Sequence, residues 1–182
     1  PGSATMGHKT ETTQMTEQER RRRRSTEPGH RRKFLVVIDE TPECDRAVYY
    51  ASRRAQSTGG AIVMMAVVDP VDPQLSRSVE ELMRQEARDA ATAALEAAAS
   101  RTRLISGLEP ETRIEEGERA TVIQRAIETD EDIAILVLAA ATGREGPGPL
   151  VSTLAGKASG TFPIPITIVP GDLTDEEIDA LA

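Results

Sequence analysis

Residues 34–39, with the sequence Phe-Leu-Val-Val-Ile-Asp, form an apolar run that ends on a carboxylate. The run is short and rich in β-branched residues, which predicts a strand buried on both faces of a sheet. Thr41 and Pro42 follow and predict a helix that begins there, with Thr41 as the N-cap and proline at the first helical position. Gly59 and Gly60 mark the end of this helix. A buried strand followed directly by a helix indicates the start of an α/β fold.

The same alternation of apolar runs and helical patterns continues to the end of the chain. We expect four more strands, at residues 61–68, 112–115, 133–139 and 164–169, with helices between them. Short helical crossovers between apolar strands imply parallel pairing, with helices on both faces of the sheet. The predicted fold class is therefore α/β, with a five-stranded, mainly parallel sheet in a Rossmann-like three-layer sandwich.

Two of these strands carry signs of an edge position. The strand at 112–115 alternates polar residues, which suits the edge of a sheet better than its centre. Pro165 lies inside the last predicted strand, and a proline within a strand is tolerated mainly at an edge. We therefore expect the strands at 112–115 and 164–169 to have at least one open side.

The longest predicted helix precedes the strand at 112–115. Ser78 and Glu81 match a capping box and predict the start of this helix. Its alanine-rich part, residues 87–99, has high helix propensity and little side-chain bulk, so it can pack closely on a sheet. The residues expected on its inner face recur at helical spacing: Val79, Leu82, Met83, Ala90, Ala94 and Ala97.

The charge of the chain is divided unevenly. The 182 residues are enough for one globular domain, and their formal net charge is −8. Residues 1–33 carry nine basic and four acidic side chains, a charge of +5, so the remainder carries −13. Residues 1–5 resemble a remnant of cloning ahead of Met6 or Met15. We expect three parts: a disordered basic tail over 1–32, an α/β domain over 33–170 and an acidic C-terminal helix over 171–182.

The tail contains a run of five arginines, residues 20–24. Such a run can contact nucleic acid or anionic lipid, or it can be a solvated, self-repelling segment. The second alternative is favoured, because no aromatic residues interleave with the arginines and the acidic body repels a phosphate backbone. We therefore expect no nucleic-acid partner. The basic tail is the only segment that is a candidate for such a contact. No apolar run suits a membrane helix or a signal core, so we expect no membrane contact and a cytoplasmic location.

Histidine and cysteine usage limits the chemistry. Both histidines, His8 and His30, lie in the predicted tail, which excludes histidine-based triads, metal sites and acid–base chemistry from the predicted domain. Cys44 is the only cysteine, so the chain can form neither an internal disulfide nor a thiolate cluster. We expect no metal site, no catalytic residues and no strongly active enzyme, with weak nucleotide hydrolysis left open.

Glycines cluster after the strand at 133–139, at Gly143, Gly146, Gly148 and Gly156. Glycine lets backbone N–H groups approach an anion, and the helix that follows this loop would point its positive end at that anion. The loop is therefore either a phosphate cradle or a flexible Gly/Pro loop without a ligand. Asp39 has two similar alternatives, because it can accept a hydrogen bond from a ligand or cap the next helix.

The strand that ends in Val-Ile-Asp39, the order of the elements and a Gly-x2-Gly-x9-Gly loop after the fourth strand together resemble the universal stress protein family. Gly143, Gly146 and Gly156 meet the loop spacing. The resemblance covers about Phe34 to Pro170 and implies the adenine nucleotide alpha hydrolase-like form of the fold. Some members of this family bind ATP, and others bind no nucleotide.

The resemblance implies a site for ATP or a related adenine nucleotide, with Mg²⁺ as an accompanying ion. In ATP-binding members the aspartate and the end of the second strand contact adenosine. The loop glycines hold ribose and phosphates there, and the residue after the last glycine contacts phosphate. With Val37 added as an aliphatic wall, the expected site in this chain consists of Val37, Asp39, Val67, Gly143, Gly146, Gly156 and Lys157.

The sequence departs from the family pattern at three places. Lys157 stands where the family has Ser or Thr, Glu145 stands where it often has His, and Gly117-Glu118-Arg119 replaces the usual Gly-x-Pro. Two functions stay open: a regulatory module that binds an adenine nucleotide without strong catalysis, and a nucleotide-free dimeric protein of the stress response. Since the family often dimerises through its last strand, we expect a homodimer formed through Ile164 to Val169.

Overall fold

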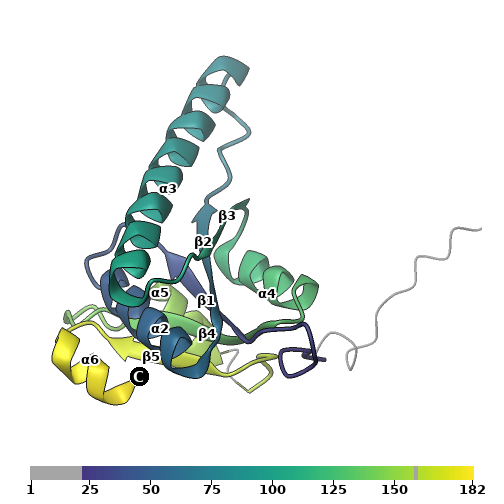
Figure 1. Ribbon diagram of the computed structural model, residues 1–182. Coiled ribbons are helices and arrows are strands. Elements are labelled where there is room, and N and C mark those ends of the chain that lie inside the picture. Colours follow the sequence, from purple (N-terminus) through teal and green to yellow (C-terminus); the bar gives the residue numbers. More distant parts are fainter. Residues whose placement is uncertain (1–21, 158–159) are drawn as a thin grey trace, which may run out of the picture.

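The computed structural model describes residues 22–157 and 160–182 and contains one five-stranded sheet with the order β3-β2-β1-β4-β5 (Figure 1). Every pair of neighbouring strands is parallel. The strands are β1 (Lys33–Ile38), β2 (Ala61–Val68), β3 (Glu111–Glu116), β4 (Ile133–Ala140) and β5 (Ile166–Pro170). The structure thus confirms the predicted α/β class and the predicted parallel sheet.

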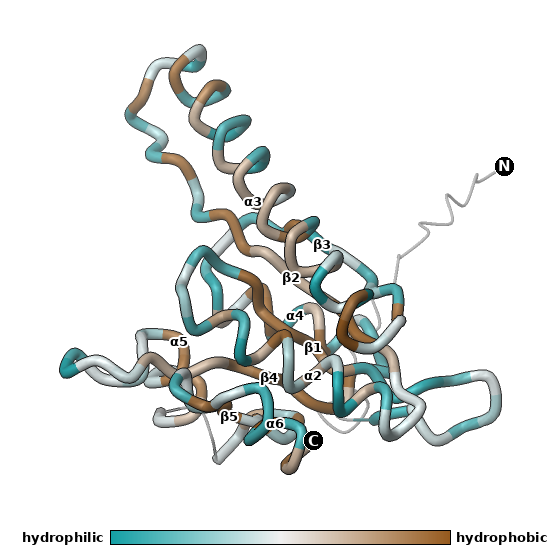
Figure 2. The backbone as a smooth tube through the Cα atoms, turned by 60° about the vertical axis from the view of Figure 1, so that its left-hand side comes forward, coloured by the Kyte–Doolittle hydropathy of each residue, from teal (hydrophilic) through white to brown (hydrophobic). Residues whose placement is uncertain are grey.

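Helices cover both faces of the sheet. They are α2 (Cys44–Thr58), α3 (Arg77–Ser106), α4 (Arg119–Thr129), α5 (Pro149–Val151) and α6 (Asp175–Leu181), and α5 continues as a π-helical stretch, Ser152–Lys157. One face packs against α2, α3 and α6, and the other packs against α4, α5 and the π-helical stretch. The result is a three-layer sandwich, with the most hydrophobic backbone running through its middle (Figure 2).

The central strand β1 is buried along its apolar run, as its composition predicts. Phe34, Val36 and Ile38 belong to the core beneath α2 and α3. Leu35 and Val37 point to the opposite face and pack in the core beneath α4. Because successive side chains of a strand alternate between faces, a run that is apolar at every position suits a strand covered on both sides.

The two predicted edge strands, β3 and β5, lie at the two edges of the sheet. The last strand begins at Ile166 rather than at Ile164, so Pro165 lies just outside it. The backbone carbonyl of Pro165 accepts a hydrogen bond from the Leu136 amide at 3.0 Å. Ile164 is buried in the core instead of lying on the edge. Proline therefore ends the pairing at the start of β5, because it has no N–H to donate.

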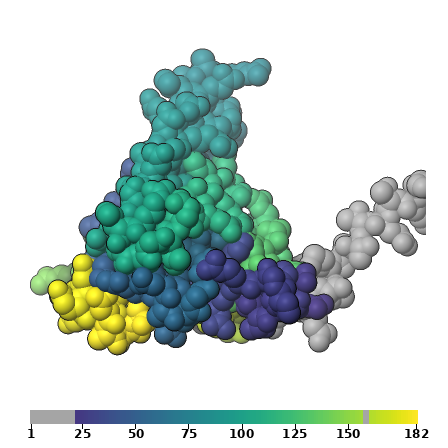
Figure 3. All heavy atoms as spheres, viewed as in Figure 1, coloured from purple at the N-terminus to yellow at the C-terminus, as the bar shows by residue number. Residues whose placement is uncertain are grey.

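Helix α3 extends well beyond the sheet, and its first half projects from the body (Figures 1 and 3). The predicted inner face is wrong here, because Val79, Leu82 and Met83 are exposed, Leu82 at 59%. The predicted capping box is also wrong, since Ser76 precedes the first helical residue and Ser78 lies within the helix. A helical repeat predicts which residues share a face, but it does not show whether a sheet reaches that far.

Residues 22–32 differ from the disordered tail that the composition predicts. The Arg23 guanidinium donates through Nη1 to the carbonyls of Ile127, Asp130 and Ile133, at 2.6, 3.1 and 3.1 Å. The His30 ring lies 2.7 Å from an oxygen of Asp132. Charged groups hold this segment in place although it buries little apolar surface, so a criterion based on hydrophobic burial misses it. Residues 1–21, with the predicted remnant and the first two arginines of the run, lie outside the described residues.

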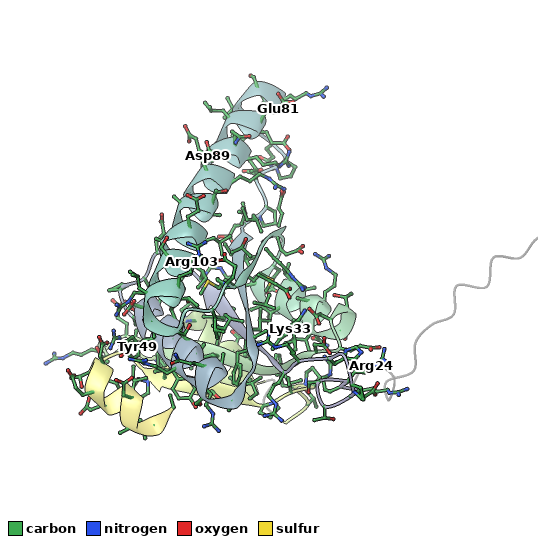
Figure 4. All side chains as sticks on the ribbon, viewed as in Figure 1. Arg24, Lys33, Tyr49, Glu81, Asp89 and Arg103 are labelled. Atoms are coloured by element: carbon green, nitrogen blue, oxygen red, sulfur yellow. The ribbon has the colours of Figure 1, made fainter. Side chains whose placement is uncertain are left out.

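The C-terminal helix α6 packs on α2 and does not stand apart from the domain. Thr174 and Glu177 form the predicted capping box at its start. Ile178 is fully buried in the same core as β1. Tyr49, labelled beside α6 in Figure 4, donates its hydroxyl to Asp179 at 3.1 Å. Three guanidinium groups lie 5.4–5.5 Å from the centre of the Tyr49 ring, those of Arg46, Arg53 and Arg101.

Candidate functional site

The strand order reverses at β1, which places a crevice at the carboxyl ends of the central strands. The chain moves from β1 to β2 and β3 on one side, and β4 and β5 lie on the other. Ligands of open parallel sheets bind where the order reverses, because the crossover helices leave in opposite directions and the crevice between them stays open. Asp39 follows the last residue of β1 and therefore lies at this point.

Two cavities meet there. The first, the β2 cavity, has a volume of about 560 Å³ and lies between the ends of β1 and β2 and the alanine face of α3. Its lining residues in α3 are Ala87, Ala90, Ala91 and Ala94. Two of the alanines predicted to pack on the sheet, Ala90 and Ala94, therefore form a wall of this cavity. A wall of small side chains leaves room for a flat group such as a base.

The second cavity, the β4 cavity, lies between the ends of β1 and β4 and the start of α5. Its volume is about 120 Å³. Its walls include Leu138 and Ala139 from β4 and Gly148 and Pro149 from the loop that follows. The residues that line both cavities are Val37, Asp39, Thr41 and Arg119.

Asp39 accepts a backbone hydrogen bond and also lines both cavities. Its Oδ1 accepts a hydrogen bond from the Thr41 amide at 2.9 Å and another from the Thr41 hydroxyl. This turn corrects the predicted N-cap, because the helix begins at Cys44 and no side chain caps it. Within the described residues no hydrogen bond reaches Oδ2 of Asp39, so this oxygen can accept one from a ligand.

Two aliphatic residues of the predicted site line the cavities. Val37 lines both cavities, and Val67 lines the β2 cavity near the end of β2. Val37 is buried and Val67 is half-buried. The structure thus brings Val37, Asp39 and Val67 together around one crevice, although Val67 is far from the other two in the sequence.

The glycine loop is arranged differently from the predicted cradle. Gly143, Gly146 and Gly156 line neither cavity. The Gly146 amide donates to the Gly143 carbonyl at 3.3 Å, which closes a turn of the loop on itself. Gly148, which the sequence analysis left out of the site, has a φ of +99° and lines the β4 cavity. A positive φ is the condition that favours glycine, so the requirement for glycine at the cavity falls on Gly148.

The helix after the loop gives little support to an anion. Helix α5 has only three residues before the π-helical stretch begins, and its first residue, Pro149, has no N–H group. The predicted positive helix end at this place is therefore weak. Lys157 is the last residue of the π-helical stretch, and its side chain lies outside the described residues.

Sequence reasoning missed Thr41, Glu43 and Arg119 as lining residues. Arg119 is the first residue of α4 and lies where the family has proline. That departure from the pattern was visible in the sequence, but a charged residue at the start of a helix is ordinarily solvent-exposed. Glu43 and Thr41 lie in the turn between β1 and α2, and only the closing of this turn brings them to the cavities.

The single cysteine has an unreactive thiol. Cys44 is buried beside the β4 cavity, and its thiol lies 3.7 Å from the Val37 carbonyl. Burial raises the pKa of the Cys44 thiol to about 11, because the thiolate would lose its hydration. A thiol with so high a pKa is not a nucleophile at neutral pH.

Across residues 22–157 and 160–182, the structure has no group of three or more His, Cys, Asp or Glu side chains that could hold a metal ion. In the same part of the chain, no helix has the length and apolar character needed to cross a membrane.

The fold is that of a doubly wound α/β protein with a crevice at the carboxyl ends of its parallel strands. The model of the universal stress protein family matches residues 30–170, and the chain belongs to this family. No curated protein is similar enough to the chain to count as a relative.

Solved structures of universal stress proteins share the fold at low sequence identity. UspA from Lactobacillus plantarum is 18% identical, with a TM-score of 0.64 over 76% of this chain and 97% of that one. A family member from Arabidopsis thaliana, solved with AMP bound, is 17% identical, with a TM-score of 0.52 over 80% of this chain and 94% of that one. One from Archaeoglobus fulgidus, solved in complex with dAMP, is also 17% identical, with a TM-score of 0.52 over 76% and 97%.

Proposed function

We propose that this protein is a regulatory module that binds ATP or a related adenine nucleotide, without strong catalysis. The observation that carries this proposal is the pair of cavities that share Val37 and Asp39 at the reversal of strand order. Family members from Arabidopsis thaliana and Archaeoglobus fulgidus were solved with AMP and dAMP, which supports the same class of ligand here.

The β2 cavity suits the adenine base of the nucleotide. Its walls are mostly aliphatic, from Val37, Val67 and the alanines of α3, and its volume of about 560 Å³ lies in the range of small-molecule sites. The carboxylate of Asp39 supplies an acceptor for an amino or hydroxyl group of adenosine. Adenine would therefore lie between aliphatic side chains, since none of the described residues that line this cavity is aromatic.

The same residues favour binding over turnover. Carboxylates of Asp39, Glu40, Glu43 and Asp69 line the two cavities, and no histidine of the described residues lines either of them. Asp39 is engaged in the turn with Thr41, which fixes the orientation of its carboxylate. We infer a protein that holds its nucleotide and passes on a signal through it.

The test is direct detection of nucleotide. Denaturing the purified protein should release an adenine nucleotide, which ion-pair chromatography identifies. A protein purified without nucleotide should melt at a higher temperature in millimolar Mg-ATP, because a ligand that binds only the folded state stabilises it. No released nucleotide together with no shift in melting temperature would refute the proposal.

A matched pair of variants tests the role of Asp39. Asp39→Asn should weaken nucleotide binding about tenfold or more, since it removes a charged acceptor. Asp72→Asn is the control, because Asp72 forms a similar turn with the Gln74 amide at 2.9 Å, loses the same charge and lies outside both cavities. Equal nucleotide affinity of the two variants would exclude Asp39 from the site.

A second function, association of two copies through β5, is favoured by one observation. Strand β5 is an edge of the sheet, and Ile168 on it is 40% exposed. We propose that two copies pair along this strand, because an exposed apolar edge offers unpaired backbone groups and hydrophobic surface to an identical partner. This proposal also covers the alternative of a dimeric protein without a nucleotide.

Light scattering measures the mass that decides this question. The unchanged protein should have the mass of a dimer, and Ile168→Arg should have that of a monomer. Leu181→Arg is the control, because Leu181 is also an exposed aliphatic residue, at 62%, but lies on α6. A monomeric unchanged protein, or a dimeric Ile168→Arg variant, would exclude β5 as the interface.

A further inference from the structure

We propose that Arg119 binds a phosphate group of the nucleotide and makes the site prefer phosphorylated adenosine over adenosine itself. This inference rests on the proposed function, because it assigns one end of the same ligand. It does not follow from the family pattern, which has proline at this position.

Arg119 is placed where the two cavities join. Its side chain lines both the β2 cavity and the β4 cavity. Among the described residues that line either cavity, it is the only basic one. The other charged residues of the walls are all carboxylates: Asp39, Glu40, Glu43 and Asp69. Arg119 is therefore the cation that these two cavities offer to an anionic ligand, whereas each of these carboxylates would repel it.

The backbone before α4 holds Arg119 at this junction. The Gly117 amide donates to the Val68 carbonyl at the end of β2, at 3.1 Å, which ties the start of α4 to the β2 cavity. Gly117 has a φ of +147°, and a Cβ there would lie 2.8 Å from a methyl group of Val122. Glycine is thus required two residues before Arg119, and it directs the chain from β3 back over the crevice.

Two amides at the start of α4 already have a carboxylate as their partner, which favours the side chain of Arg119 as the donor to an anion. The Glu118 carboxylate accepts hydrogen bonds from the Ala120 and Thr121 amides, at 3.0 and 2.8 Å. A phosphate that approached these amides would meet this carboxylate. A guanidinium, by contrast, can donate two parallel hydrogen bonds to one phosphate.

Arg119 is also able to turn toward a ligand at little cost. Its one ion pair within the described residues is with Asp69, at 4.0 Å, and the Asp69 side chain is 74% exposed. Exposed pairs of this length contribute little stability, because water screens them. A phosphate in the crevice can therefore replace Asp69 as the partner of Arg119.

The experiment compares AMP with adenosine by titration calorimetry on the full chain, freed of nucleotide. Arg119→Gln should weaken AMP binding about 10- to 100-fold, the effect of losing a charge-assisted hydrogen bond, and should leave adenosine binding unchanged. The AMP affinity of Arg119→Lys should lie between those of the unchanged protein and Arg119→Gln, because lysine keeps the charge without the paired donors. The loss of AMP affinity with added salt should be smaller for Arg119→Gln than for the unchanged protein.

Arg125→Gln is the matched control, since Arg125 lies on the same helix, pairs with Glu115 and lines neither cavity. It should bind AMP like the unchanged protein. Equal AMP affinity of Arg119→Gln and Arg125→Gln would overturn the inference and leave the proposed function intact. An equal loss of AMP and adenosine binding in Arg119→Gln would also overturn it, because Arg119 would then only support the fold. An unchanged protein that binds neither compound would refute both proposals.

Discussion

Removing Arg23 should destabilise the protein by about 2–3 kcal/mol, although composition alone assigns this residue to a disordered tail. One guanidinium nitrogen donates to three carbonyls at and beyond the end of α4, at 2.6, 3.1 and 3.1 Å. A hydrogen bond that involves a charged group contributes about 1.5–3 kcal/mol. The three bonds share a single nitrogen, so their contributions do not add. We expect a loss of unfolding free energy equal to that of about one strong hydrogen bond.

Urea denaturation measures this difference. For a domain of this size, a loss of 2–3 kcal/mol lowers the midpoint of unfolding of Arg23→Ala by about 1–2 M. The matched control is Arg22→Ala, because the Arg22 side chain is 69% exposed and its ion pair among the described residues is with Glu27, at 3.5 Å. We expect its unfolding free energy to change by less than about 0.5 kcal/mol.

Limited trypsin digestion provides a second measurement on the same segment. Trypsin cleaves after arginine in extended, accessible chain, and the docking of Arg23 should protect the bond between Arg23 and Arg24 in the folded protein. If Arg23→Ala and Arg22→Ala unfold at the same urea concentration, and the bond is cleaved as fast as in a free peptide, residues 22–32 are not held to the domain and the reasoning is refuted.

Three further predictions concern the body of the protein. Ile178→Ala should lower the unfolding free energy by about 2–4 kcal/mol in urea, because Ile178 is fully buried, whereas Leu181→Ala on the exposed side of α6 should leave it nearly unchanged. Burial opposes ionisation of Asp130, but hydrogen bonds from Lys33 and Arg113 outweigh it and lower the pKa of this carboxyl. Its stabilising effect should therefore be complete above its unfolded pKa, near 4, and disappear as pH falls through the folded value, so Asp130→Asn should be less stable at pH 7 and flatten the acid part of a stability curve. Cys44 should react with a thiol reagent at pH 8 only after unfolding, because its pKa is about 11, and rapid reaction in the folded state would contradict the burial.

The sequence predicts the sheet well and predicts three residues that the structure brings to one crevice, because these features depend on local signals. The apolar run of β1 and the carboxylate that follows it are adjacent in the chain, so one pattern defines the strand and places Asp39 at its end. The family resemblance adds Val67 by matching a second strand end. Val37, Asp39 and Val67 meet at the crevice because parallel strands bring their carboxyl ends to one side of the sheet.

The features that the sequence does not predict depend on where distant segments meet. Spacing alone picks Gly146 for the cradle, but the closed turn of the loop leaves Gly148 at the cavity. Arg119 shows no motif, and only the tie between Gly117 and β2 brings it to the crevice. Leu82 fits a helical face, yet the sheet ends before that face begins.

The chain contains two tyrosines and no tryptophan, which gives the Tyr49 cluster a spectroscopic consequence. Three guanidinium groups surround the Tyr49 ring, and its hydroxyl donates to a carboxylate of α6. Release of α6 would take that carboxylate from the hydroxyl and expose the ring to water, which alters the emission of one of only two fluorophores. Tyr50→Phe removes the other one, so the remaining fluorescence would report on the docking of the C-terminal helix without an added label.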